Sequence, residues 1–87
     1  MRTWYLRIVD TSNGYAGVVP PWNGYMVEGM EVEFDGSDHY VSDFDSWGTF
    51  ENVSDAVERL DNVVQNYHKA QHWDGFAQWL YDGSLVP

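Results

Sequence analysis

The residues best suited to chemistry in this chain are carboxylates. The sequence holds 14 Asp and Glu against four Lys and Arg, a formal net charge of −10 at pH 7. Most of the acids fall between Glu28 and Asp61, where Arg59 is the single basic residue. A small domain stays soluble with a net charge of about 2–8 in magnitude, so solubility alone does not require this excess. We therefore expect the acidic segment to recognise a positively charged partner.

The spacing of the acids indicates rows of charge. Glu31, Glu33 and Asp35 alternate along a predicted strand, which places neighbouring carboxylates about 6.6 Å apart on one face. This separation is comparable to that of successive phosphates along one strand of DNA. Asp43 and Asp45 fall on the returning strand, and we expect them on the same face. Like charges opposite each other destabilise a sheet, so the pattern favours a functional interpretation.

A second row lies at the start of a predicted helix. Glu51, Asp55 and Glu58 are spaced i, i+4, i+7, which places them along one side of a helix. No lysine lies nearby to neutralise this row. We expect both rows to converge into one continuous anionic surface.

In its size, in its acidity from Glu28 to Asp61 and in its lack of recognisable catalytic residues, the chain resembles the small acidic inhibitors of phages and mobile elements. These include DNA-mimic anti-restriction and anti-CRISPR proteins. The resemblance implies a non-enzymatic, stoichiometric inhibitor that blocks a basic nucleic-acid-binding protein, with carboxylates in place of phosphates. The residues expected to contact that partner are Glu31, Glu33, Asp35, Asp43, Asp45, Trp47, Glu51, Asp55 and Glu58, with Trp47 as an apolar anchor.

Two alternatives to this interpretation are a solvated acidic face and a structural adaptor. The acids could form a solvated face with no partner. The chain could also be a structural adaptor that assembles through exposed aromatic side chains, and Trp22 and Trp47 are the candidates because both are predicted in loops beside Pro or Gly. Tryptophan is enriched among the residues that dominate binding energy at interfaces. We expect the protein to be a monomer or a homodimer.

A metal-binding module is a further alternative, although we expect no metal and no other cofactor. His68 and His72 have the i, i+4 spacing that can hold zinc on a helix, but no third ligand is evident. Asp43, Asp45 and Gly48 resemble the opening of a calcium loop, but Trp47 and Ser54 stand where oxygen ligands belong. The spacing thus favours neither site.

The remaining composition restricts the functional classes. No serine has a neighbouring histidine base and no phosphate-binding glycine loop is present, so we expect no catalytic activity. The net charge disfavours direct binding to nucleic acid or to anionic membranes. The sequence has no cysteine and no apolar run of membrane-spanning length. We therefore expect a cytoplasmic protein, located in the host cell if phage-encoded.

The elements that must position the carboxylates follow from periodicity. Strands are predicted at 4–9, 15–19, 25–34 and 39–44, with turns at Asn13-Gly14 and Asp35-Gly36 and a bulge near Gly29. A helix with an apolar stripe is predicted from 53 to 67, capped by Asn52 or Ser54. A shorter helix is predicted at about 74–82 and ends at Gly83.

The predicted order gives an α+β fold in one domain that spans residues 1–87. It consists of a small antiparallel β-sheet of three to four strands, followed by two α-helices packed on one face. The 15 aromatic residues are expected to supply much of the core, because a domain of 87 residues has a thin margin of stability and each buried aromatic side chain removes about 150–250 Å² from water.

Overall fold

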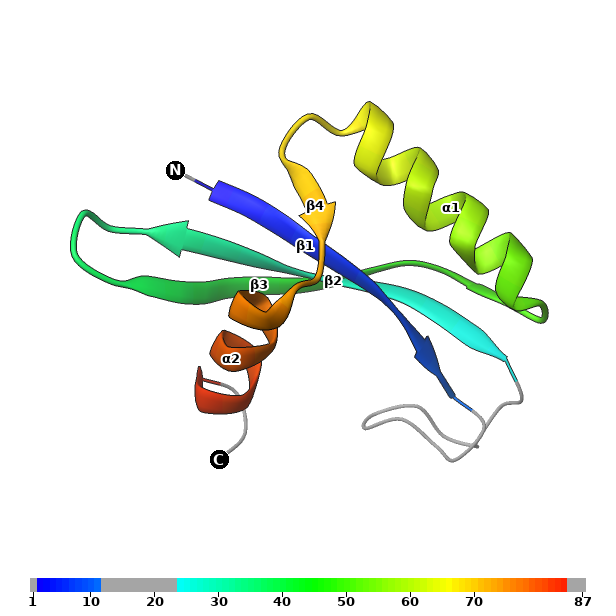
Figure 1. The fold of residues 1–87 in the computed structure, drawn as a ribbon, viewed down its shortest axis with the longest axis horizontal. Coiled ribbons are helices and arrows are strands. Elements are labelled where there is room, and N and C mark those ends of the chain that lie inside the picture. The colour runs from blue at the N-terminus through cyan, green and yellow to red at the C-terminus, as the bar shows by residue number, and fades with distance from the viewer. Residues whose placement is uncertain (1, 12–23, 85–87) are drawn as a thin grey trace.

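A computed structural model describes residues 2–11 and 24–84 and confirms the α+β class (Figure 1). A four-stranded sheet in the order β3-β2-β1-β4 carries two helices. The predicted strand at 15–19 lies outside the described residues. The elements in chain order are β1 (Arg2–Asp10), β2 (Tyr25–Phe34), β3 (His39–Phe50), α1 (Val53–Asn66), β4 (Ala70–His72) and α2 (Gly75–Ser84).

The sheet is mixed, whereas the sequence predicted an antiparallel one. β2 pairs antiparallel with both β1 and β3, but β4 pairs parallel with β1 from Trp4 opposite Ala70 to Leu6 opposite His72. Three residues are too few to show an alternating pattern, so periodicity could not reveal β4. Its position depends on backbone hydrogen bonds to β1: Trp4 N–H donates to Lys69 O at 2.7 Å, and Trp73 N–H donates to Leu6 O at 2.8 Å.

The two helices cover opposite faces of the sheet, which corrects the prediction that both pack on one face. Trp4 and Leu6 of β1 belong to the core under α1, which also holds Val27 of β2 and Ala56, Leu60 and Val63 of α1. Tyr5, between them in the sequence, packs instead against the core under α2, which holds Met30 and Val32 of β2 and Ala77 and Leu80 of α2. Successive side chains of a strand point to opposite faces, so these are two separate cores. β4 lies between the helices in the chain and carries it from one face to the other (Figure 1).

β3 continues to Phe50, six residues beyond its predicted end at Phe44. Two register shifts against β2 each leave one extra residue on β3, between the partners of Met26 and Glu28 and between those of Glu31 and Val32. The bulge predicted near Gly29 therefore occurs on the neighbouring strand. Gly48, at φ +121°, provides the left-handed backbone conformation at the first of these shifts.

The hairpin between β2 and β3 forms as predicted. Gly36 has φ +98°, a conformation that favours glycine. The Asp35 carboxylate accepts hydrogen bonds from the N–H groups of Ser37 and Asp38, both at 2.8 Å. The turn is therefore fixed by the side chain that opens it.

Both helices start where the sequence predicts, whereas α2 does not end where predicted. α1 begins after Asn52, which occupies the N-cap position but makes no side-chain capping hydrogen bond. α2 begins after Asp74, whose carboxylate accepts a hydrogen bond from the N–H of Ala77 at 3.0 Å. Gly83 lies within α2, so the predicted stop there is wrong. In the described ranges, neither helix combines the length and the apolar character that crossing a membrane requires.

Candidate functional site

Four of the predicted contact residues lie together on the sheet face that carries α1. Asp43 pairs directly with Glu31 across β2 and β3, and Asp45 lies two residues further along the same strand. Glu33 lies two residues beyond Glu31, so all four point to one side. Asp43 and Asp45 are exposed, and Glu31 and Glu33 are half-buried. We call Glu31, Glu33, Asp43 and Asp45 the acidic surface.

Hydrogen bonds orient the carboxylates of the acidic surface. Ser42 Oγ donates to Glu31 Oε1 at 2.8 Å. The carboxylates of Asp43 and Asp45 accept from the N–H of the residue that follows each of them, also at 2.8 Å. Directly opposed side chains of an antiparallel pair have Cβ atoms about 4.5–5.5 Å apart, so the charges of Glu31 and Asp43 repel at close range.

Arg2 is the one basic side chain that forms an ion pair with the acidic surface within the described residues. Its Nε lies 2.9 Å from Glu33 Oε1. The hydrogen bond from Arg2 is the main cause that lowers the pKa of Glu33, and the same bond raises the pKa of Arg2. The Tyr40 hydroxyl donates to the other Glu33 oxygen at 3.4 Å, and the charge of Glu33 raises the pKa of Tyr40. Glu33 is therefore partly neutralised, whereas the other three carboxylates have no such partner ion in this part of the chain.

Asp35 does not join the row that the alternation predicted. β2 ends at Phe34, and the Asp35 carboxylate turns back to hold the hairpin. Hydrogen bonds from the N–H groups of Asp38 and then Ser37 are the largest causes that lower the pKa of Asp35. Its role in the structure is the turn, although its side chain remains exposed.

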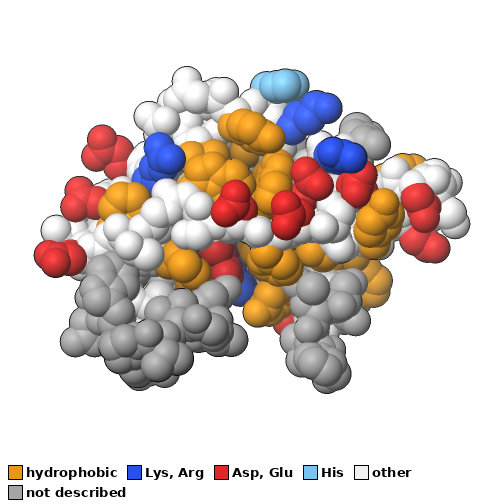
Figure 2. Space-filling view, turned by 180° about the vertical axis from the view of Figure 1, so that it is seen from behind, with side chains coloured by type: hydrophobic (Ala, Val, Ile, Leu, Met, Phe, Trp, Pro, Cys, Tyr) orange, Lys and Arg blue, Asp and Glu red, His pale blue; other side chains and the backbone are white. Residues whose placement is uncertain are grey.

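The predicted helical row forms only in part, because Asp55 and Glu58 lie on α1 whereas Glu51 precedes the helix and its N-cap Asn52. Glu51, Asp55 and Glu58 are all exposed, and Asp55 and Glu58 line a shallow groove together with Phe50, Arg59 and Asn62. Arg59 Nε donates to the carbonyl of Trp47 at 3.0 Å. Seen from behind, acidic side chains lie in separate groups with apolar and neutral side chains between them (Figure 2). The expected single continuous surface is therefore divided.

Trp47 lies in β3 and not in a loop. Its ring meets that of Trp4 edge to face, with centroids 5.0 Å apart and planes at 79°. A Cβ added to Gly29 would lie 2.7 Å from the Trp47 ring, so the glycine leaves room for it. Trp47 is half-buried against the core under α1, which leaves less of the ring to anchor a partner. Trp22 lies outside the described residues.

The sequence interpretation missed a buried ion pair under α2. Glu28 is 2% exposed, and its Oε1 lies 2.7 Å from Arg7 Nε. Arg7 Nη1 donates to Gln78 Oε1 at 3.0 Å, and the guanidinium lies 4.0 Å from the centre of the Trp73 ring and 4.8 Å from that of Tyr81. Glu28 stands among the apolar residues of one strand face, and Arg7 lies on the neighbouring strand. That combination was the available signal for a buried pair.

The suggested metal positions do not assemble. His68 follows the end of α1 and His72 lies in β4, so the two do not share a helix. His72 Nε2 instead lies 3.4 Å from Asp61 Oδ1. Asp43, Asp45 and Gly48 belong to a strand and not to a calcium loop. Across residues 2–11 and 24–84, no group of three or more His, Asp or Glu side chains could hold a metal ion.

The chain matches no known protein-family model, and comparisons with curated proteins and with solved structures gave no match.

Proposed function

We propose that this protein is a non-enzymatic inhibitor that binds a basic nucleic-acid-binding protein in a stoichiometric complex. Its carboxylates occupy positions that the phosphates of the nucleic acid would otherwise take. The proposed target is a host defence nuclease complex of the CRISPR or restriction type. The observation that supports this proposal best is the pairing of Glu31 with Asp43, with Asp45 and Glu33 on the same face.

Local energetics support a binding role for these four residues. Like charges directly opposite each other destabilise a strand pair, and Glu31 and Asp43 occupy such a position. Within the described residues, Arg2 forms an ion pair with Glu33 alone among these four, and the hydrogen bond and charge of Glu33, and then the charge of Glu31, raise the pKa of Arg2. A basic groove would relieve this repulsion when it binds, because each carboxylate would then gain an opposite charge.

The spacing supports the choice of a phosphate-binding partner. Side chains two residues apart on a strand are about 6.6 Å apart, a separation comparable to that of neighbouring phosphates. Two adjacent strands then present carboxylates in two dimensions on a rigid sheet. Opposite charges also speed diffusional encounter, so we expect fast association that slows as salt is added.

The experiment compares two triple variants with equal changes in charge. One is Glu31→Gln/Asp43→Asn/Asp45→Asn, which keeps the shapes and the hydrogen-bond acceptors. The matched control is Glu51→Gln/Asp55→Asn/Glu58→Gln at the start of α1. Each purified protein is titrated against a guide-RNA-loaded DNA nuclease and against a restriction endonuclease, with DNA cleavage and surface plasmon resonance as the measurements.

We expect wild type to inhibit cleavage and compete with DNA in at least one of these systems. The variant of the acidic surface should bind about tenfold more weakly or worse, and the control should lose less. Affinity for the nuclease should fall steeply between low and high salt. An affinity that is unchanged both by added salt and by the variant of the acidic surface would contradict the proposal. An absence of binding to any basic nucleic-acid-binding protein would contradict it as well.

A further inference from the structure

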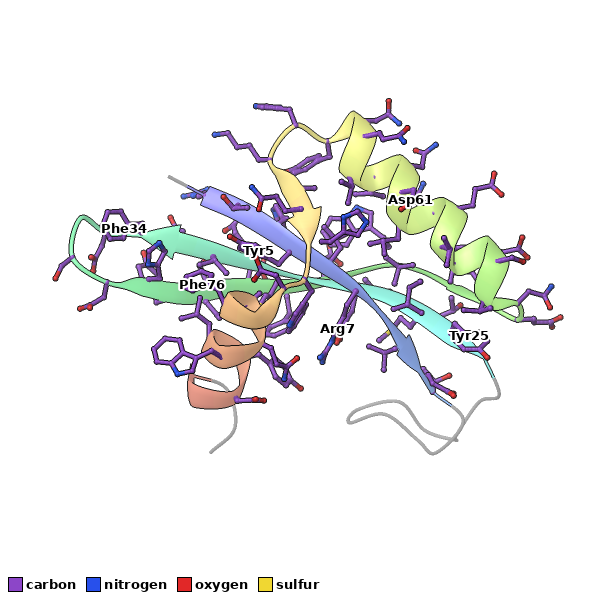
Figure 3. All side chains as sticks on the ribbon, viewed as in Figure 1. Tyr5, Arg7, Tyr25, Phe34, Asp61 and Phe76 are labelled. Carbon is purple, nitrogen blue, oxygen red and sulfur yellow. The ribbon has the colours of Figure 1, made fainter. Side chains whose placement is uncertain are left out.

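A second exposed surface lies at the α2 side of the sheet, near the β2–β3 hairpin. Its members are aromatic rings from the four elements β1, β2, β3 and α2, shown in part in Figure 3, where Tyr5, Phe34 and Phe76 are labelled. Trp79 is 69% exposed, and Phe34 and Phe76 are each a little over one third exposed. We call the following residues the aromatic surface: Tyr5, Phe34, His39, Phe76 and Trp79.

Ring contacts make most of this surface continuous. The His39 ring lies 4.7 Å from that of Phe34 and 5.0 Å from that of Phe76, centre to centre. Tyr5 meets Phe76 edge to face at 6.3 Å. A small open hollow is lined by Tyr5, Phe34 and His39, together with Thr3 and Val32. The hairpin and the first turn of α2 therefore present one array of rings to solvent.

The core does not require this exposure. Ala77 and Leu80 are the residues of α2 that are almost fully buried in the core on the sheet, and Tyr81 packs partly buried beside them. Phe76 and Trp79 are three residues apart, so they lie on the same side of the helix, next to the side that carries Ala77 and Leu80. Trp79 is directed mostly to solvent. Exposed aromatic residues that contribute little to the core are typical of interaction surfaces.

The charges around the aromatic surface favour a cation as its ligand. Asp35 and Asp38 lie in the adjoining turn, and Asp74 precedes α2. Burial and then the charge of Asp74 raise the pKa of Tyr5, so this carboxylate is close to the rings. The chain's own arginines contact other groups: Arg2 pairs with Glu33, Arg7 pairs with Glu28, and Arg59 bonds to the Trp47 carbonyl. A second copy of the chain would bring its own net charge of −10, which opposes self-association here.

The molecule contains an example of the same chemistry. Arg7 lies over the rings of Trp73 and Tyr81 and pairs with the carboxylate of Glu28. Guanidinium groups stack on aromatic faces more readily than ammonium groups do. We infer that the aromatic surface binds an arginine side chain of the basic partner protein, with Trp79 as the principal contact. This inference rests on the proposed function, since the partner is the same. The aromatic surface supplies the exposed apolar anchor that the half-buried Trp47 does not.

The two surfaces lie on opposite faces of the sheet, so a partner held by both must reach round the hairpin. Asp35 and Asp38 lie at that end of the sheet, between the faces. The acidic surface would then set the rate of association through long-range attraction, and the aromatic surface would slow dissociation through short-range contact.

The test uses labelled octa-arginine and octa-lysine peptides as probes, with fluorescence anisotropy at low salt. The variants are Trp79→Ala, the conservative Trp79→Phe, and Val57→Ala as a control at an exposed apolar residue of α1. Trp79→Ala should weaken octa-arginine binding about 2- to 5-fold and octa-lysine binding less, because the lost contact is a cation–π contact at an exposed site. Trp79→Phe should lie between wild type and Trp79→Ala, and Val57→Ala should match wild type.

Equal affinity of wild type and Trp79→Ala for octa-arginine would overturn the inference, as would an equal loss for both peptides. A wild-type dimer in sedimentation that Trp79→Ala dissociates would also overturn it, because a second copy would then occupy the surface. The triple variant Glu31→Gln/Asp43→Asn/Asp45→Asn separates the two proposals. If it binds both peptides as wild type does while Trp79→Ala loses octa-arginine, the proposed role of the acidic surface fails and the inference stands.

Discussion

At the residue scale, the acids of this chain serve different purposes although the sequence groups them together. Glu28 is part of the core, Asp35 fixes a turn, Glu33 pairs with Arg2, and Asp43 carries an exposed charge. Residue type does not separate these roles, because each depends on which groups the fold places beside the carboxylate. The residue with the strictest requirement is Glu28, since a buried carboxylate needs a partner ion.

Loss of that partner gives the first prediction. Arg7→Met should lower the free energy of unfolding by about 3–5 kcal/mol, because it leaves the Glu28 carboxylate buried without its ion pair. Chemical denaturation followed by tryptophan fluorescence measures the loss. A chain of this size has a total stability of only about 4–13 kcal/mol, so the variant will be partly unfolded at low denaturant.

The control for this prediction is the double variant Arg7→Met/Glu28→Gln. It removes both charges, and it should recover a large part of the lost stability. The single variant Glu28→Gln completes the comparison. If the double variant loses as much stability as Arg7→Met and Glu28→Gln lose when added together, the destabilisation arises from packing around Trp73 and not from the buried charge.

Asp35 gives a prediction about pH. Its folded-state pKa is lowered, chiefly by the N–H groups of Asp38 and Ser37, so the ionised form is favoured in the folded state. The resulting stabilisation is present above the unfolded pKa, ordinarily 3.8, and is lost as pH falls through the lower folded pKa. Wild type should therefore be more stable than Asp35→Ala near neutral pH, and the difference should shrink below pH 3.8. Urea denaturation across this range measures it, and a gap that widens in acid would refute this account.

At the element scale, β3 combines two tasks. It carries Asp43 and Asp45 and also forms an edge of the sheet. The N–H groups of Phe44 and Ser46 bond to the carboxylates of the preceding aspartates, and that of Gly48 bonds to Ser46 Oγ. Charges and bulges are common protections of an edge strand against unwanted pairing. The two aspartates therefore protect the strand as well as charging its face.

The contact between β2 and β3 gives a prediction at Gly29. A Cβ there would lie 2.7 Å from Trp47 and 3.3 Å from both Leu6 and Trp4, so Gly29→Ala overpacks the core under α1. We expect a loss of about 1–3 kcal/mol in the free energy of unfolding. Gly75→Ala is the matched control, since an added Cβ there meets nothing within 4 Å. Equal stability of the two variants by thermal denaturation would contradict the packing account.

At the scale of the whole molecule, net charge opposes the compact state. The net charge is −10 on 87 residues, so electrostatic self-repulsion acts on every element. The close pair of Glu31 and Asp43 adds a local repulsion between the two strands. Salt screens exposed charges over a Debye length of about 8 Å at physiological ionic strength. The stability of the folded state should therefore depend on ionic strength.

This sensitivity is the last prediction. The melting temperature of wild type should rise as sodium chloride is added, because screening weakens the repulsion. Glu31→Gln/Asp43→Asn should melt roughly 2–4 °C higher than wild type at low salt and converge with it at high salt. Differential scanning calorimetry measures both trends. A melting temperature that falls with salt would mean that attractive ion pairs outweigh the repulsion.

The sequence by itself determined the α+β class, the strand from Tyr25 to Phe34, the hairpin turn and the starts of both helices. These features depend on local periodicity and on turn and capping residues, so they can be read from neighbouring positions in the chain. It also indicated a row of acids on β2 and β3, because alternation decides which side chains share a strand face.

Only the tertiary structure decided which faces the helices cover, where β4 pairs and which acids stay exposed. These outcomes depend on contacts between residues far apart in the chain, such as Arg7 with Glu28 and Trp4 with Trp47. A three-residue strand has no pattern of its own, and the apolar neighbours of Glu28 indicate burial but do not identify the guanidinium that pairs with it. The division of the acidic segment into separate groups follows from the same cause, since packing determines which side chains become neighbours.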